Sequence, residues 1–164
     1  MPNWIRFLHP RLRQPKRRGE WAEATFLAKA MGQGLQVCKP CGDSEPFDFV
    51  VFNVRHWMNR VQVKSAWRRF PQSQGYKIEN NRRHFDRSEF DVLVVVLPEV
   101  DAWYVIPADA VHLQKAVWLY PRKPSKKKGM KTFEQYRETW HLLTGDESGA
   151  WARYQRFTIH ANAE

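Results

Sequence analysis

Apolar and polar positions along the chain alternate in ways that predict one helix followed by several strands. Apolar residues recur at helical spacing from Trp21 to Met31, and Gly32 and Gly34 mark the end of this helix. Short runs rich in aromatic and β-branched residues predict strands at residues 35–38, 47–54, 60–66, 91–97, 103–106 and 116–120. The run 91–97 is almost wholly apolar and is followed by Pro98, a pattern typical of a strand buried on both faces.

The segments between these runs complete the predicted architecture. Residues 47–54 and 60–66 are close enough to form a hairpin, residues 107–111 a short helix, and the polar, basic stretch 67–90 a long loop. Residues 132–143 predict a C-terminal helix with Thr132 as its N-cap. Its stripe of apolar residues is more typical of a packing or dimer face than of a base-stacking surface: Phe133, Tyr136, Trp140 and Leu143. The order of elements predicts an α/β domain whose central mixed sheet is flanked by helices, with a helical C-terminal extension.

The length and composition predict a single folded domain with appended ends. At 164 residues and 43% hydrophobic content the chain is large enough to bury a core. We expect a basic N-terminal arm at residues 1–17, a core at 18–121, and a basic linker with the C-terminal extension at 122–164. No apolar run is long enough to span a bilayer and no secretory signal is visible, so we expect a cytoplasmic protein without membrane association. Cys38 and Cys41 lack the second ligand pair that structural zinc needs.

The excess of positive charge is concentrated in three stretches. The formal net charge is +10, and residues 1–18 and 122–131 each hold six basic residues and no acid, while residues 55–87 hold nine against two acids. Clustered Lys and Arg indicate a polyanionic partner, because they neutralise phosphates and release counterions. A solvated charge run or a disordered tail is the alternative. The predicted DNA contacts are Arg17, Arg18, Arg68, Arg69, Lys126, Lys127, Lys128 and Lys131.

A set of polar residues on the predicted hairpin has the composition of a metal-dependent nuclease site. Because side chains alternate along a strand, Gln62 and Lys64 share one face, and Asp48 on the neighbouring strand can approach it. Glu23 on the helix could complete the group. Carboxylate and amide oxygens suit Mg²⁺, and a Lys nearby can stabilise the charge that develops during phosphodiester hydrolysis.

The same residues also have an interpretation without chemistry. Asp48 could cap the turn after Pro46, and Gln62 and Lys64 could form the solvated face of a hairpin. Glu20 and Glu23 could be a favourable acidic first turn on a helix dipole. The spacing of the four residues does not by itself exclude this reading.

A resemblance to a known family favours the nuclease. The sequence resembles the PD-(D/E)XK nuclease superfamily, most closely its group I intron homing endonuclease branch and more distantly the archaeal Holliday junction resolvases. The resemblance spans roughly residues 16–120. In that branch a Gln replaces the acidic residue before the Lys, as Gln62 does here. The matching segments are residues 19–23 (GEWAE), 34–37 (GLQV), 46–48 (PFD), 61–65 (VQVKS), 91–97 (DVLVVVL) and 103–107 (WYVIP).

The resemblance implies a role for each of these residues and a fold. Asp48 would be the metal-binding acid, Gln62 the substituted ligand, Lys64 the catalytic lysine and Glu23 the helix-borne acid, with Glu20 as the weaker candidate. The fold would be restriction-endonuclease-like. The activity would be Mg²⁺-dependent endonucleolytic cleavage of duplex DNA, with Mn²⁺ as an alternative cofactor, by a homodimer or homotetramer.

Two alternatives stay open at this point. Gln62 carries no charge, so the chain could be a DNA-binding module of the same fold that has lost catalysis. The chemistry could also act on branched DNA, as in a Holliday junction resolvase.

Overall fold

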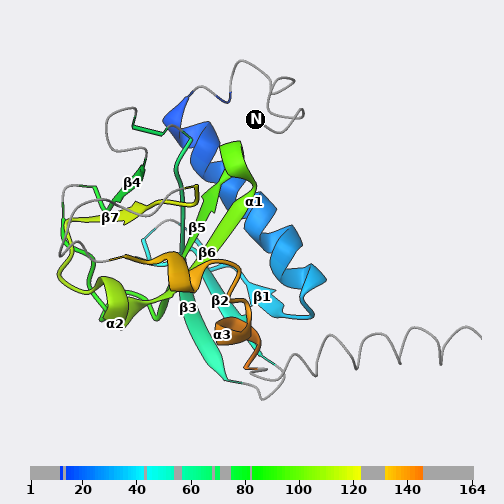
Figure 1. Cartoon of the computed structure of the whole chain (residues 1–164). Coiled ribbons are helices and arrows are strands. Elements are labelled where there is room, and N and C mark those ends of the chain that lie inside the picture. Colours follow the sequence, from blue (N-terminus) through cyan, green and yellow to red (C-terminus); the bar gives the residue numbers. More distant parts are fainter. Residues whose placement is uncertain are drawn as a thin grey trace, which may run out of the picture.

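The structure of the protein, a computed structural model, is built around a central five-stranded sheet (Figure 1). It describes residues 12, 14–42, 44–53, 57–67, 69–70, 75–81, 83–122 and 132–145. The central sheet has the strand order β1-β2-β3-β5-β6, with bounds Gln36–Cys38, Phe49–Phe52, Met58–Ser65, Val92–Leu97 and Ala102–Pro107. A separate two-stranded sheet pairs β4 (Tyr76–Glu79) with β7 (Ala116–Leu119). The helices are α1 (Pro15–Gly32), α2 (Ala108–Val111) and α3 (His141–Thr144), with 3₁₀ turns η3 (Pro98–Val100) and η4 (Glu134–Tyr136).

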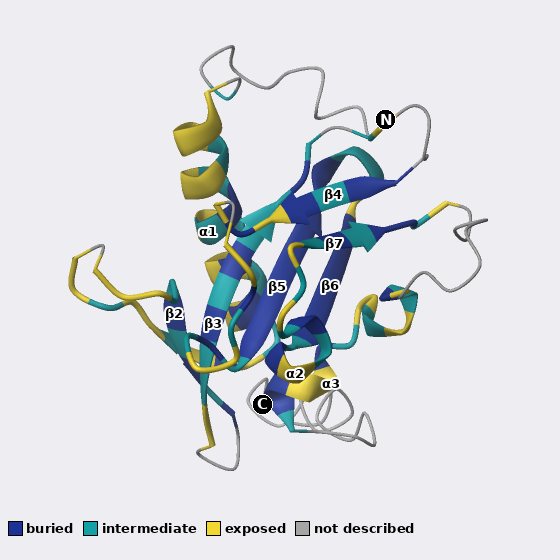
Figure 2. Cartoon of the chain, turned by 90° about the vertical axis from the view of Figure 1, so that its left-hand side faces the viewer, coloured by how far each residue is buried: buried dark blue, intermediate teal, exposed yellow. Residues whose placement is uncertain are grey.

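The central sheet is mixed, as the order of elements predicted. Strand β3 runs antiparallel to β2 and parallel to β5, and β6 returns antiparallel to β5. Every residue of β5 is buried, and β5 lies between β3 and β6, which confirms the prediction that this apolar run is a strand buried on both faces (Figure 2). The α/β class with a mixed sheet flanked by helices is therefore confirmed.

Helix α1 covers one face of the sheet. It buries Ala22, Phe26 and Ala30, four residues apart on one side, in a cluster that includes Val61 and Val63 of β3. The helix begins at Pro15, before Trp21, where the apolar pattern starts, because Pro is favourable at the first helical position and the following Lys and Arg are good helix formers.

The opposite face of the sheet packs against the β4–β7 pair and α2 (Figure 1). The prediction of a continuous loop over residues 67–90 was wrong, because β4 lies within it. In β4, Tyr76 and Ile78 are buried and alternate with the outward-facing Lys77 and Glu79, which is the pattern of a half-buried strand. Strand β7 exists as predicted, but it pairs with β4 outside the central sheet.

The C-terminal segment is not the continuous helix predicted for residues 132–143. After η4 the chain turns extended at Arg137, which bridges to Tyr104 of β6, and Glu138 adopts a positive φ of 52°. The Glu138 N–H donates to the Trp103 carbonyl and the Glu138 carboxylate accepts from the Trp103 N–H, so Glu138 binds the edge of β6 and does not continue a helix. Thr132 caps no helix, since the residue before η4 is Phe133.

The apolar stripe of this segment nevertheless packs as expected. Phe133, Trp140 and Leu143 are buried, the first on the β4–β7 side and the other two on the α1 side of the sheet. The segment thus wraps around the β6 edge and protects it from pairing with another chain. Among the described residues, no helix has the length and apolar character that a membrane crossing would require.

Candidate active site

Strand β3 carries two of the four predicted site residues on one face. Gln62 and Lys64 are in register with Leu93 and Val95 of β5, which belong to the core on the β4–β7 side. Val63, between them, is buried on the α1 side. The alternation predicted from the sequence is therefore confirmed.

Asp48 is held against Gln62 by hydrogen bonds to both the side chain and the backbone of β3. It lies directly before β2, where its N–H donates to the Val61 carbonyl (2.9 Å). Its Oδ2 accepts hydrogen bonds from Gln62 Nε2 (2.6 Å) and from the Val63 N–H (2.7 Å). Its Oδ1 makes no hydrogen bond within the described part of the chain, so one carboxylate oxygen stays available to a ligand.

Lys64 is partly buried and makes no hydrogen bond or ion pair with any other described residue. Burial lowers the pKa of Lys64, although the negative charge of Asp48 acts in the opposite direction. Burial also raises the pKa of Asp48, helped by the charge of Glu23 and opposed by the Val63 hydrogen bond. Burial therefore disfavours the charged form of both groups, and a ligand of opposite charge would stabilise each: a cation for Asp48 and an anion for Lys64.

Of the two acids on α1, Glu23 is the one that shares a hollow with Asp48, Gln62 and Lys64. The reading of Glu20 and Glu23 as an acidic first turn was wrong, because the helix begins at Pro15 and its first turn holds no acid. Glu23 and Asp48 line the same hollow, and the charge of Glu23 acts on the pKa of both Asp48 and Lys64. Glu20 pairs with Arg17 (2.9 Å), with 46% of its side chain exposed, and lines an adjoining hollow that also includes Glu23 and Asp48. Only Glu23 lines the hollow that contains Gln62 and Lys64.

Lys39, a residue that sequence reasoning missed, makes an ion pair with the site. Its Nζ lies 2.7 Å from Glu23 Oε2, and it lines an adjoining hollow that also includes Glu23 and Asp48. Lys39 lies in the loop after β1, between Cys38 and Cys41, and nothing in its sequence context indicates this contact. The two cysteines themselves are exposed free thiols.

The hollow around these residues has a volume of about 560 Å³ and lies between the first turns of α1, the end of β3 and β4. Besides Glu23, Asp48, Gln62 and Lys64, its wall includes Arg18, Trp67, Phe70 and Lys77. All four predicted site residues are therefore brought together. Within the described residues there is no group of three or more His, Cys, Asp or Glu that could hold a metal, so any ligand set here must use the Gln62 amide or backbone oxygens beside the two acids.

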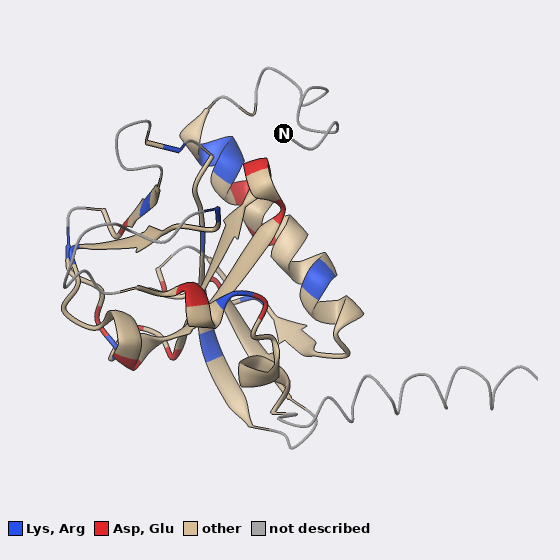
Figure 3. Ribbon diagram, in the orientation of Figure 1, with Lys and Arg blue, Asp and Glu red and all other residues tan. Residues whose placement is uncertain are grey.

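The predicted DNA contacts are only partly placed by the structure. Arg18 lines the hollow with its guanidinium 5.4 Å from the Trp67 ring centroid, whereas 55% of the Arg17 side chain is exposed. Figure 3 shows basic and acidic residues close together in the first part of α1. Arg69 follows the end of β3 and is partly buried. The remaining predicted contacts lie outside the described residues: Arg68, Lys126, Lys127, Lys128 and Lys131.

Comparisons with known proteins show a similarity in both sequence and fold. Residues 13–143 match the model of a family described as PD-(D/E)XK endonuclease, which extends beyond residue 120, where the resemblance was expected to end. A bacterial homing endonuclease, I-Ssp6803I, has a similar structure, with a TM-score of 0.65 and 28% sequence identity over 79% of this chain and 93% of that one. A search of curated proteins finds no match.

Proposed function

Since the chain belongs to the PD-(D/E)XK endonuclease family, we propose that it is a metal-dependent endonuclease that hydrolyses phosphodiester bonds in duplex DNA. The observation that carries the proposal is that Asp48 and Lys64, which makes no ion pair with a described residue, line one hollow together with Glu23 and Gln62. The similarity to a bacterial homing endonuclease and the excess of basic residues support DNA as the substrate.

The residues in the hollow fit a hard divalent cation such as Mg²⁺, or Mn²⁺ in its place. Asp48 offers the free Oδ1, and Glu23 offers a second carboxylate once Lys39 moves away. In the structure Gln62 turns its amide nitrogen toward Asp48, so offering its oxygen requires rotation of the amide. The Val63 carbonyl is a further oxygen, because in a strand it points to the same side as the Val63 N–H that Asp48 accepts from. Oxygen donors of this kind are the ligands Mg²⁺ prefers.

Each residue of the site has a separate task. When bound, the ion would polarise the phosphate and lower the pKa of a water molecule. Val63 and Gln62 orient the Asp48 carboxylate by hydrogen bonds at 2.7 and 2.6 Å. Lys64, whose partly buried ammonium has no ion-pair partner among the described residues, binds the phosphate and stabilises the negative charge that develops on it. Arg18 at the rim adds attraction for the DNA backbone.

We further propose a homo-oligomer, dimer or tetramer, because cutting both strands of a duplex at one site takes two such hollows. Light scattering of the purified protein would measure this directly, and a monomer that still linearises plasmid would contradict it.

The test of the proposed function is cleavage of plasmid DNA. The full chain is incubated with supercoiled plasmid and Mg²⁺ or Mn²⁺, beside Asp48→Asn, which keeps the size of the side chain and removes its charge. We expect nicked or linear product from the wild type and none from the variant. Intact plasmid with every metal and many DNA sequences, or equal cutting by Asp48→Asn, would refute the proposal.

A calorimetric titration of Mg²⁺ separates catalysis from simple DNA binding. The nuclease binds the metal and loses that binding in Asp48→Asn, whereas an inactive DNA-binding module of the same fold takes up no metal but retains salt-dependent DNA affinity. Comparison of a four-way junction with linear duplex of equal length tests the resolvase alternative.

A further inference from the structure

Three aromatic rings lie together along the outer side of the β4–β7 pair: Phe70 is exposed, Trp118 is partly exposed and Tyr120 is buried. In this pair Tyr76, Ile78, Val117 and Leu119 are buried toward the core. The residues that alternate with them, Lys77 and Trp118, lie opposite each other in register and so share the outer face. Trp118 stacks on Tyr120, with ring centroids 6.4 Å apart and an angle of 18° between the planes.

Phe70 extends this group of rings toward the hollow. Its ring centroid lies 5.3 Å from that of Trp118 in a T-shaped arrangement, and 45% of the residue is exposed. Its backbone N–H donates to the Gly75 carbonyl at 2.8 Å. At Gly75 an added Cβ would lie 2.7 Å from the Tyr120 ring, so only glycine allows the chain to approach these rings this closely. Phe70, Trp118 and Tyr120 are hereafter the aromatic ledge.

The aromatic ledge meets the candidate active site at Phe70. Phe70 and Lys77 line the same hollow as Asp48, Gln62 and Lys64. Trp67, another ring in the wall, is already engaged on both sides, by Trp21 at 4.9 Å and by the Arg18 guanidinium at 5.4 Å. Phe70 therefore presents an exposed apolar ring to the space in which the proposed function places a phosphodiester.

The ligand that fits a cationic group and an exposed ring side by side is a nucleotide with an accessible base face. Lys64, which has no ion-pair partner among the described residues, matches a phosphate in charge, whereas Lys77 is already paired with Glu79. A ring such as Phe70 offers a stacking partner to any base. In an intact duplex both faces of each base are covered by its neighbours. A base can stack on Phe70 only where the strand is locally unpaired.

We propose that Phe70, backed by the other two rings of the aromatic ledge, stacks an unpaired nucleobase beside the phosphate to be cut, so that DNA with a local bubble is bound in preference to intact duplex. The inference rests on the proposed function for the place of the phosphate, and it concerns the structure of the substrate. Stacking on aromatic side chains tolerates every base, so the preference is for unpaired DNA and independent of sequence.

The test compares two DNA probes that differ only in base pairing. One is a labelled duplex and the other is the same duplex with three central mismatches, so both carry the same number of phosphates and the electrostatic attraction is matched. Affinities are measured for the full chain without divalent metal, so that no cleavage occurs. We expect the bubble to bind about tenfold more tightly, given the stabilisation that one base–aromatic stack provides.

Two variants show whether Phe70 causes the preference. Phe70→Leu keeps an apolar side chain and removes the ring, and it should bring the two affinities to within about twofold while leaving duplex binding unchanged. Trp57→Ala removes another exposed ring, 65% accessible and outside the wall of the hollow, and should retain the preference. A 2-aminopurine in the bubble should lose fluorescence on binding wild type and keep it with Phe70→Leu.

The outcomes separate this inference from the proposed function. Equal affinity of the wild type for both probes, or equal loss by Phe70→Leu on both, overturns the stacking role even if plasmid is cut. A bubble preference that depends on Phe70, in a protein that cuts no DNA with any metal, supports stacking and refutes the nuclease. If Phe70→Leu unfolds at the same temperature as the wild type, its loss of bubble preference is not caused by a general loss of structure.

Discussion

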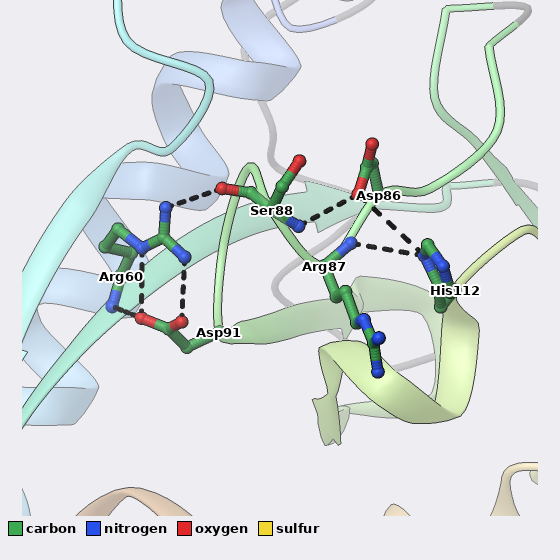
Figure 4. A network of polar contacts seen from close by, with 6 residues as sticks. All are labelled: Arg60, Asp86, Arg87, Ser88, Asp91 and His112. Atoms are coloured by element: carbon green, nitrogen blue, oxygen red, sulfur yellow. Dashed lines mark hydrogen bonds and ion pairs between the residues drawn. The ribbon is translucent and has the colours of Figure 1, made fainter.

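The two ends of strand β3 each place a cation beside a carboxylate, and they treat the charges in opposite ways. At its start, Arg60 makes hydrogen bonds to both oxygens of Asp91, at 2.9 and 3.1 Å, and its backbone N–H adds a third at 2.8 Å (Figure 4). The hydrogen bonds from Arg60 lower the pKa of Asp91, and those to Asp91 raise the pKa of Arg60. Each charge stabilises the other.

At the other end of β3, Lys64 and Asp48 do not form an ion pair with each other. Lys64 forms no ion pair with the described residues, and burial moves its pKa down and that of Asp48 up. Both shifts mean that burial disfavours the charged forms, the reverse of the Arg60–Asp91 pair. Residue type therefore does not distinguish a structural ion pair from a candidate site, whereas the presence or absence of a partner for each charge does.

The largest expected effect comes from removing the unpaired cation. Lys64→Met should lower the rate of plasmid cleavage on the order of 100- to 1000-fold, the range for loss of one group that stabilises transition-state charge. Its unfolding midpoint should be unchanged or higher, because a buried charge without a partner is removed. Lys115→Met, exposed and outside the hollow, is the control for losing one positive charge. A Lys64→Met variant that has a lower unfolding midpoint but cuts at the wild-type rate would show that Lys64 has a structural role.

A smaller effect is expected at the helix. Glu23→Gln should slow cleavage by about 10- to 100-fold, as is common when a group that supports a metal is lost. Glu20→Gln, on the same helix and paired with Arg17, should cut within twofold of wild type. Measured rates in the reverse order would show that Glu20 is the acid of the site.

The sequence predicted the parts of this site that depend on strand periodicity. Gln62 and Lys64 share a face because side chains alternate, and Asp48 reaches them because the hairpin brings residue 48 opposite the end of β3. The choice of Glu23 over Glu20 needed the register of α1. The Val63 N–H that fixes Asp48 is a backbone group, which leaves no trace in residue type.

The parts that failed depend on tertiary contacts. The stretch 132–143 has helical spacing of its apolar residues, but the open edge of β6 offered hydrogen bonds to Glu138 and a bridge to Arg137 that outweighed local preference. Strand β4 is only four residues long, and its alternation is too short to stand out in a polar segment.

The ion pair between Lys39 and Glu23 should weaken metal binding slightly. Lys39→Met removes the cation that occupies Glu23 Oε2 at 2.7 Å, so the affinity for Mg²⁺ in calorimetry should rise, by up to about fivefold for a pair this exposed. Lys39→Arg retains the charge and should stay near wild type. Unchanged or weaker binding of Mg²⁺ in Lys39→Met would mean that Lys39 does not compete with the metal for Glu23.

The smallest effect is expected at the Arg60–Asp91 ion pair at the start of β3. Asp91→Asn should lower the free energy of unfolding by about 1 kcal/mol, a value kept low because the Asp91 side chain is 40% exposed, and should leave cleavage unchanged. The pKa of Asp91 is lower in the folded protein than its ordinary 3.8, so this stabilisation is complete above pH 5 and is lost as the pH falls through the folded pKa. Urea unfolding from pH 3 to 7 should therefore show the free energies of unfolding of wild type and Asp91→Asn converging only at the acidic end.

The control is Asp109→Asn, which breaks the more exposed pair with Arg87 and should change the free energy of unfolding by less than about 0.5 kcal/mol. A pH-independent difference for Asp91→Asn would mean that its carboxylate acts through shape alone, and the contrast between the two ends of β3 would then not be electrostatic.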